Sequence, residues 1–165
     1  MSTKTTLAGN EDELKVFATF LKIPFEKSDM SGVLQNIQKH WKYIISAANS
    51  CETEESLATK LIRILVPLSG EKHSKLQEST SAQDAVFLLH EYASVSQRVL
   101  IDLISRTKKV QARRIGDIII ELNFSVITLL ERLGAPERYT AIWRNSFPDE
   151  ILEGTIIHDT VATMQ

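Results

Sequence analysis

The stretch Arg113–Gly134 constrains the fold more than any other part of this chain. When it is placed on a helix at about 100° per residue, its apolar side chains form one broad stripe. The stripe consists of Ile115, Ile118, Ile119, Leu122, Val126, Leu129, Leu130 and Leu133. A second apolar stripe, Ile120, Phe124 and Ile127, lies roughly opposite the first. A helix that is apolar on two sides is expected to be covered on both, which predicts a central helix within a bundle.

Two glycines refine this prediction. A glycine inside a helix costs about 1 kcal/mol relative to alanine, so at Gly116 we expect a neighbouring element to approach closely. Gly134 fits the position after a helix end, and Pro136 begins the next segment. The competing interpretation is a strand through residues 118–120, because β-branched residues favour strands. The helical period continues for about five to six turns without a turn residue, which favours the helix.

The composition agrees with a helical domain. The chain has 165 residues, which is enough for one domain with a single core. Only 6 residues are glycine and 4 are proline, which argues against a turn-rich β-sandwich. We therefore predict an all-α, single-domain bundle of about five to six helices, with its central helix near residues 112–133. In this prediction residues 1–9 are a flexible arm, residues 10–153 form the bundle, and residues 154–165 form a tail.

Charge and cysteine content restrict the environment and the partners. The formal net charge is −2, so no global field selects nucleic acid or a membrane surface. Cys51 is the only cysteine, which excludes an internal disulfide and suits a reducing compartment. The first residues lack the apolar core of a signal peptide, and no apolar run approaches the ~20 residues that span a bilayer. We expect a protein of the cytoplasm, or of another reducing intracellular compartment, without a membrane partner.

Capping residues predict where the other helices begin. The predicted starts are Asn10–Glu13, Asp29–Ser31, Thr53–Glu55 and Ser81–Asp84. Val66–Pro67 is expected to end the third of these helices. Residues 68–81 are polar and are predicted to form a long exposed loop with room for one helical turn.

The region of residues 82–133 allows two interpretations, because no glycine or proline other than Gly116 interrupts it. It could be one helix of roughly 75 Å, which would favour filament-like assembly. Alternatively, the chain turns near Arg106–Gln111 and forms two antiparallel helices. We favour the turn, because a compact domain of this size cannot easily shield so long a rod.

The motifs of common enzyme classes are absent from the sequence. It contains no GxxxxGK[ST], no GxGxxG and no GxSxG. His90-Glu91 looks like the start of HExxH, but Ser94 occupies the place of the second histidine. The histidines are far apart in the sequence, at positions 40, 73, 90 and 158. We therefore predict no catalytic residues, no metal, no cofactor and no small-molecule substrate.

One segment has an unusual charge. Among residues 106–114, the five positions Arg106, Lys108, Lys109, Arg113 and Arg114 are basic and none is acidic; these five residues are called the basic cluster below. They could be favourable charges at a helix end, exposed on a turn. They could also contact a phosphate backbone or an acidic partner. Few aromatic residues lie nearby, so sequence-specific reading of RNA is not supported.

Aromatic residues near the end of the chain are candidates for a protein interface. Tyr139, Trp143 and Phe147 follow the central helix. Trp143 and Phe147 could close one end of the bundle as core residues. Alternatively, they could anchor a partner, because aromatic residues dominate binding energy at interfaces.

A resemblance accompanies these residues. Residues 113–147 resemble the C-terminal half of rod-shaped plant-virus coat proteins. The resemblance rests on the apolar helix together with Arg113-Arg114, Asp117, Gly134, Tyr139, Arg144 and Phe147. Those proteins are helical bundles whose inward-facing basic residues hold RNA, so the resemblance implies RNA contact by the basic residues and a viral structural role. It consists mostly of features common to helices and does not extend to the N-terminal half, so it assigns no family.

Two functional hypotheses follow. The first is a non-enzymatic helical-bundle module that mediates protein–protein interaction and assembly, including self-association. The second is a nucleic-acid-binding protein, RNA-coating or nucleocapsid-like, that uses the basic cluster.

Overall fold

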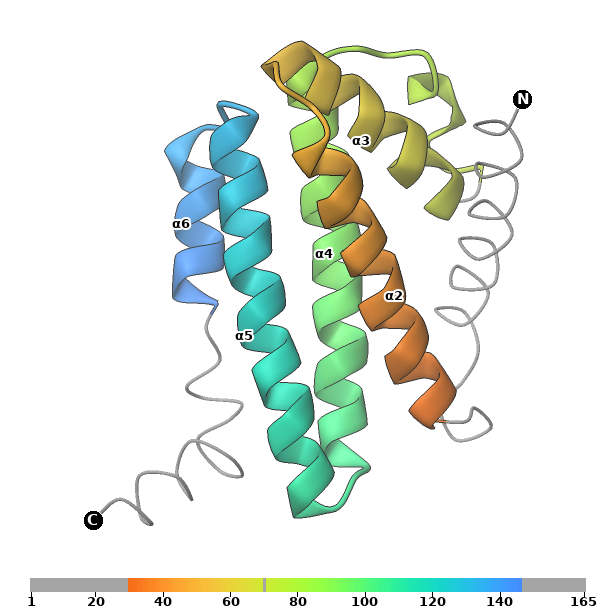
Figure 1. Ribbon diagram of the computed structural model, residues 1–165, viewed down its shortest axis with the longest axis vertical. Helices are drawn as coiled ribbons and strands as arrows, with labels where there is room; N and C mark the ends of the chain where they lie inside the picture. Colours follow the sequence, from red (N-terminus) through yellow and green to blue (C-terminus); the bar gives the residue numbers. More distant parts are fainter. Residues whose placement is uncertain (1–29, 70, 147–165) are drawn as a thin grey trace. The chain divides into compact units, whose positions relative to one another are not determined.

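The computed structural model describes residues 30–69 and 71–146, and the regular structure of these residues is entirely helical. The elements are α2 (Met30–Asn49), α3 (Glu54–Leu68), the short 3₁₀ helix η2 (Ser74–Leu76), α4 (Ala82–Ser105), α5 (Lys109–Arg132) and α6 (Glu137–Asn145) (Figure 1). This confirms the predicted all-α bundle with a central helix. The predicted arm, first helix, C-terminal tail and Phe147 lie outside the described residues. Within the described part, no helix combines the length and apolar character needed to cross a membrane.

The chain divides by its internal contacts into two units, Met1–Tyr92 and Ala93–Gln165, and the division falls inside α4. In the first unit α2 packs against α3. The Trp41 and Tyr92 rings lie 5.4 Å apart between centroids and join α2 to the first half of α4. Trp41 is 5% exposed and belongs to the core.

Helix α3 begins at the predicted position. The Thr53 side chain accepts a hydrogen bond from the backbone N–H of Ser56, and the Ser56 hydroxyl accepts one from the N–H of Thr53. This reciprocal capping box satisfies two N–H groups that the helix cannot pair internally. The predicted end at Val66–Pro67 is wrong, because α3 continues through Leu68. Pro67 is exposed and sits in the last turn, so the lost N–H affects only the end of the helix.

The polar segment of residues 71–81 is mostly exposed and contains one helical turn, as predicted. It contains the 3₁₀ turn η2, which contacts α3. The last residues of this segment form hydrogen bonds with the first turn of α4. The Ser79 hydroxyl donates to the Asp84 carboxylate at 2.6 Å, and the Ser81 hydroxyl accepts from the Asp84 N–H at 3.4 Å. The predicted helix start at Ser81–Asp84 is therefore confirmed.

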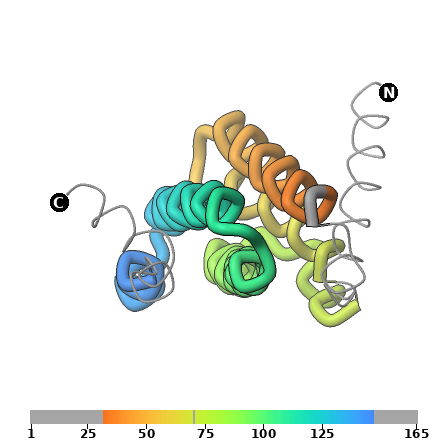
Figure 2. Tube along the Cα trace, turned by 90° about the horizontal axis from the view of Figure 1, so that it is seen from below, coloured from red at the N-terminus to blue at the C-terminus, as the bar shows by residue number. Residues whose placement is uncertain are grey.

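In the second unit the chain turns between α4 and α5, as Figure 2 shows from the end of the two helices. Residues 106–108 form this turn, which confirms two helices rather than one continuous rod. At the other end of α5, Gly134 has a φ of 68°. The N–H of Gly134 donates to the carbonyl of Glu131, and the N–H of Ala135 to that of Leu130. This is a Schellman motif, in which glycine tolerates the left-handed backbone.

The two apolar stripes of α5 differ in how completely they are buried. Most of the first stripe is buried, including Ile119, Val126 and Leu130 at 0% exposure. In the second stripe Ile127 is buried, whereas Phe124 is 59% exposed. The expectation that both sides would be covered throughout is therefore wrong at Phe124. The nine residues of α6 extend about 14 Å, against about 36 Å for α5, so α6 covers only part of its length.

Gly116 tests how tightly α5 is packed, because it is buried inside the helix. We expect Gly116→Leu to lower the free energy of unfolding by about 1–3 kcal/mol, since extra atoms in a packed site force strain. The measurement is chemical denaturation. Val110→Leu is the control, because Val110 is 84% exposed on the same helix. If Gly116→Leu were more stable than the wild type, the higher helix propensity of leucine, about 1 kcal/mol, would outweigh any strain. The neighbouring element would then leave space for a side chain at position 116.

Candidate functional site

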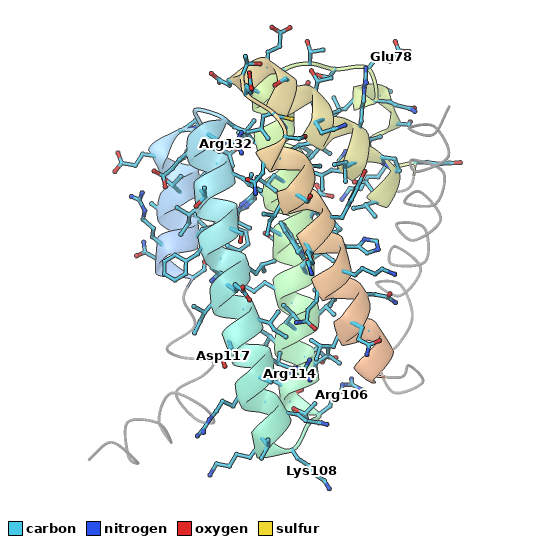
Figure 3. The ribbon with its side chains drawn as sticks, viewed as in Figure 1. Glu78, Arg106, Lys108, Arg114, Asp117 and Arg132 are labelled. Atoms are coloured by element: carbon cyan, nitrogen blue, oxygen red, sulfur yellow. The ribbon has the colours of Figure 1, made fainter. Side chains whose placement is uncertain are left out.

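The basic cluster occupies the turn after α4 and the first two turns of α5 (Figure 3). Its five side chains are exposed, and Val110 among them is 84% exposed. Arg106 pairs with Asp102 of α4, with 3.1 Å between Nε and Oδ2. Lys108, Arg113 and Arg114 form no ion pair with any residue in the described ranges 30–69 and 71–146.

The charges of the basic cluster lie at an unfavourable place on α5. The N-cap residue Lys108 makes no side-chain capping hydrogen bond, and the first turn of α5 holds no acidic residue. A helix N-terminus carries a partial positive charge, so each cation there costs about 0.3–1 kcal/mol when solvent-exposed. Only Arg106, which follows the C-terminus of α4, matches the expectation of a favourable helix-end charge. The rest of the cluster is therefore not explained by stability of the helix.

A second surface lies on α5 and α6, which pack against each other. Phe124 of α5 is 59% exposed and Ile142 of α6 is 47% exposed. These two residues are called the α5–α6 surface below. Single exposed apolar residues are common on proteins. An exposed phenyl ring is less common, because burial of a large aromatic side chain contributes more to stability than burial of a small one.

A buried amide lies beside this surface. Asn123 is 0% exposed, and its Nδ2 donates to the carbonyl oxygen of Ser146 at 3.1 Å. Its Oδ1 accepts from Nε2 of Gln97 at 3.1 Å, and the same Nε2 lies 3.5 Å from the Ser146 carbonyl. These bonds link α4, α5 and the end of α6 within the second unit. Sequence reasoning missed them, although a polar residue inside the run Leu122–Phe124 was a usable signal.

The predicted interface residues are placed as follows. Trp143 is 2% exposed and lies in the core, so it offers no surface to a partner in this conformation. Tyr139 is partly buried, and the guanidinium of Arg138 lies 5.3 Å from its ring centroid. The exposed apolar residue of α6 is Ile142, next to Trp143 in the sequence.

The first unit holds a charged contact that the sequence did not reveal. His73 Nε2 lies 3.0 Å from both carboxylate oxygens of Glu91, and its side chain is 12% exposed. Lys72 Nζ lies 3.2 Å from Glu91 Oε1 but is 68% exposed. The His73 ring also meets Phe87 edge-on, with 5.1 Å between centroids. Together these contacts hold the segment after α3 against α4.

Titration of this contact has a defined direction. Burial favours the neutral form of Glu91, but hydrogen bonds and charges from His73 and Lys72 outweigh it and lower the pKa below its ordinary 4.5. Burial also lowers the pKa of His90 from 6.5, opposed by the charge of Glu91. Glu91 therefore stabilises the fold above its unfolded pKa, and this contribution is lost as pH falls through the lowered value. His90 acts in the same direction, because its buried neutral form is lost on acidification.

Cys51 lies in the loop between α2 and α3. The Cys51 Sγ lies 3.4 Å from the carbonyl oxygen of Ala47 and 3.7 Å from that of Ser56, and either oxygen can accept its single S–H. It borders an open hollow of about 750 Å³ at the start of α3, which Lys60 and Arg63 also line. In the described part of the chain, no group of three or more histidine, cysteine or acidic side chains could hold a metal ion.

Comparison with known proteins gives no assignment. No protein-family model, no curated protein and no solved structure matches this chain.

The His73–Glu91 contact generates a prediction about the segment of residues 71–80. We expect His73→Ala to raise its rate of cleavage by a nonspecific protease several-fold at pH 7, because the tie to α4 is lost. Lys72→Ala should change it little, because ion pairs of exposed lysines contribute about 0–1 kcal/mol. In the wild type, cleavage should also accelerate as pH falls below the ordinary pKa of Glu91. Equal protection of wild type and His73→Ala would show that other contacts hold the segment.

Proposed function

We propose that this chain is a non-enzymatic helical-bundle module that associates with proteins, including copies of itself, through the α5–α6 surface. The observation that carries the proposal is the 59% exposure of Phe124, an aromatic side chain that lies on α5 between the buried residues Leu122 and Val126. The sequence adds support, since it carries none of the nucleotide-binding or hydrolase motifs described above.

The rigidity of this region supports the proposal. Phe124 follows Asn123, whose amide is held by Gln97 and Ser146 at 3.1 Å on each side. Ile142 lies one helical turn before Ser146 on α6. Arg144 of α6 also reaches Glu131 of α5, with 3.6 Å between Nη2 and Oε1. A surface whose supporting elements are already fixed loses little conformational entropy when a partner binds.

The expected energy is modest. Burying the remaining exposed part of a phenylalanine contributes about 1–2 kcal/mol, and a smaller amount comes from Ile142. In a symmetric dimer both protomers bury their copy of each residue, so each contribution counts twice. The two phenylalanines together contribute about 2–4 kcal/mol, which changes a dissociation constant by about 1.5 to 3 orders of magnitude, but area alone does not set the affinity.

Light scattering after size-exclusion chromatography tests the proposal. The chain has a mass of 18.6 kDa. We expect the wild type to exceed this mass as its concentration rises. Phe124→Gln with Ile142→Gln should raise the dissociation constant at least tenfold, because glutamine keeps the helix but removes the apolar surface.

Phe87→Gln is the matched control, because Phe87 is also exposed, at 42%, but lies on α4 in the first unit. It should associate as the wild type does. A wild type that remains at 18.6 kDa at every concentration would refute self-association. Equal association of the double variant and the wild type would show that another surface is used.

A further inference from the structure

The proposed assembly function does not use the basic cluster, whose α5 side chains are arranged in two neighbouring rows. On α5, Lys109 and Arg113 are four residues apart and therefore share one row of the helix surface. Val110 and Arg114 form the neighbouring row in the same way. Successive members of a row are separated by about 6 Å along the axis. Asp117, exposed one turn later, bounds the cluster (Figure 3).

This arrangement favours an anionic ligand. Arg113 and Arg114 are exposed and form no ion pair with the described residues, so both guanidinium groups are available. A guanidinium presents two parallel N–H groups that match the oxygens of a phosphate or carboxylate. The adjacent N-terminus of α5 adds its own partial positive charge. An anion bound here would relieve the repulsion between these cations and the positive end of the α5 dipole.

The surroundings distinguish between classes of anionic partner. Val110 is the only large apolar side chain exposed within this part of the described structure. Protein interfaces usually have an apolar or aromatic centre, and membrane-surface helices require a broad apolar face. Interfaces with nucleic acid are more polar and more positively charged. The described cluster also contains no aromatic side chain on which a base could stack.

We propose that the basic cluster binds the phosphate backbone of nucleic acid without reading its bases. The contacts come from Lys108, Lys109, Arg113 and Arg114, whereas Arg106 remains paired with Asp102. Phosphate contacts position a protein on a nucleic acid but carry no sequence information. This binding does not depend on the α5–α6 surface, so Phe124→Gln with Ile142→Gln should retain it.

Fluorescence anisotropy with a labelled 20-mer of oligouridine tests this proposal. Four cations on a single strand predict a slope of about −3 in log affinity against log salt. Affinity should therefore fall roughly 50-fold between 50 and 200 mM salt. A mixed-sequence 20-mer should bind within about twofold of oligouridine, because only backbone is contacted.

The variant Arg113→Gln with Arg114→Gln should weaken binding at least tenfold at 50 mM salt and reduce the slope by about 1.4. Its thermal midpoint should be unchanged or higher, because cations are removed from a helix N-terminus. Lys60→Gln with Arg63→Gln is the matched control, because it removes the same charge from α3. That control should bind as the wild type does.

Three outcomes would overturn the proposal. The first is no oligouridine binding by the wild type at 50 mM salt. The second is an equal loss in the test and control variants, which would reflect net charge alone. The third is equal or tighter binding to phosphatidylserine vesicles or to polyglutamate, which would indicate a membrane or an acidic protein instead.

Discussion

The buried amide of Asn123 is the constraint on which the second unit depends. An amide removed from water costs several kcal/mol unless both its donor and acceptor are satisfied. Here the acceptor is served by Gln97 of α4 and the donor by the Ser146 carbonyl at the end of α6. The end of α6 is an available acceptor because its last carbonyls have no partner within the helix. A single polar residue in the apolar run therefore determines where three segments meet.

Local features of the sequence predicted the helices well, because their causes are local. Gly134 ends α5 because a left-handed backbone is required there, and Thr53 begins α3 because its hydroxyl caps the first turn. The turn between α4 and α5 was also expected, although no glycine or proline marks it. Pro67 was misjudged, because α3 tolerates a proline at its next-to-last residue.

The surfaces were harder to predict, because burial depends on residues distant in the sequence. The period of α5 placed Phe124 and Ile127 on one stripe, but Ile127 is buried and Phe124 is exposed, because the period carries no information on how far α6 extends. The His73–Glu91 contact joins residues 18 apart and has no periodic signature. The five basic residues of the cluster could be read from the sequence. Their position at the N-terminus of α5 could not, because the sequence did not fix where α4 ends and α5 begins.

The charges at the start of α5 have a consequence for its cooperativity. The first turn of a helix frays readily, and here the repulsion between its cations and the helix dipole increases that tendency. Salt that screens this repulsion should make the first turn more ordered, which is the opposite of its effect on a helix stabilised by ion pairs. An anion that binds only the ordered first turn stabilises that order, and it therefore binds more tightly when the turn is already formed. The helix start thus couples its own order to the ionic composition of its surroundings.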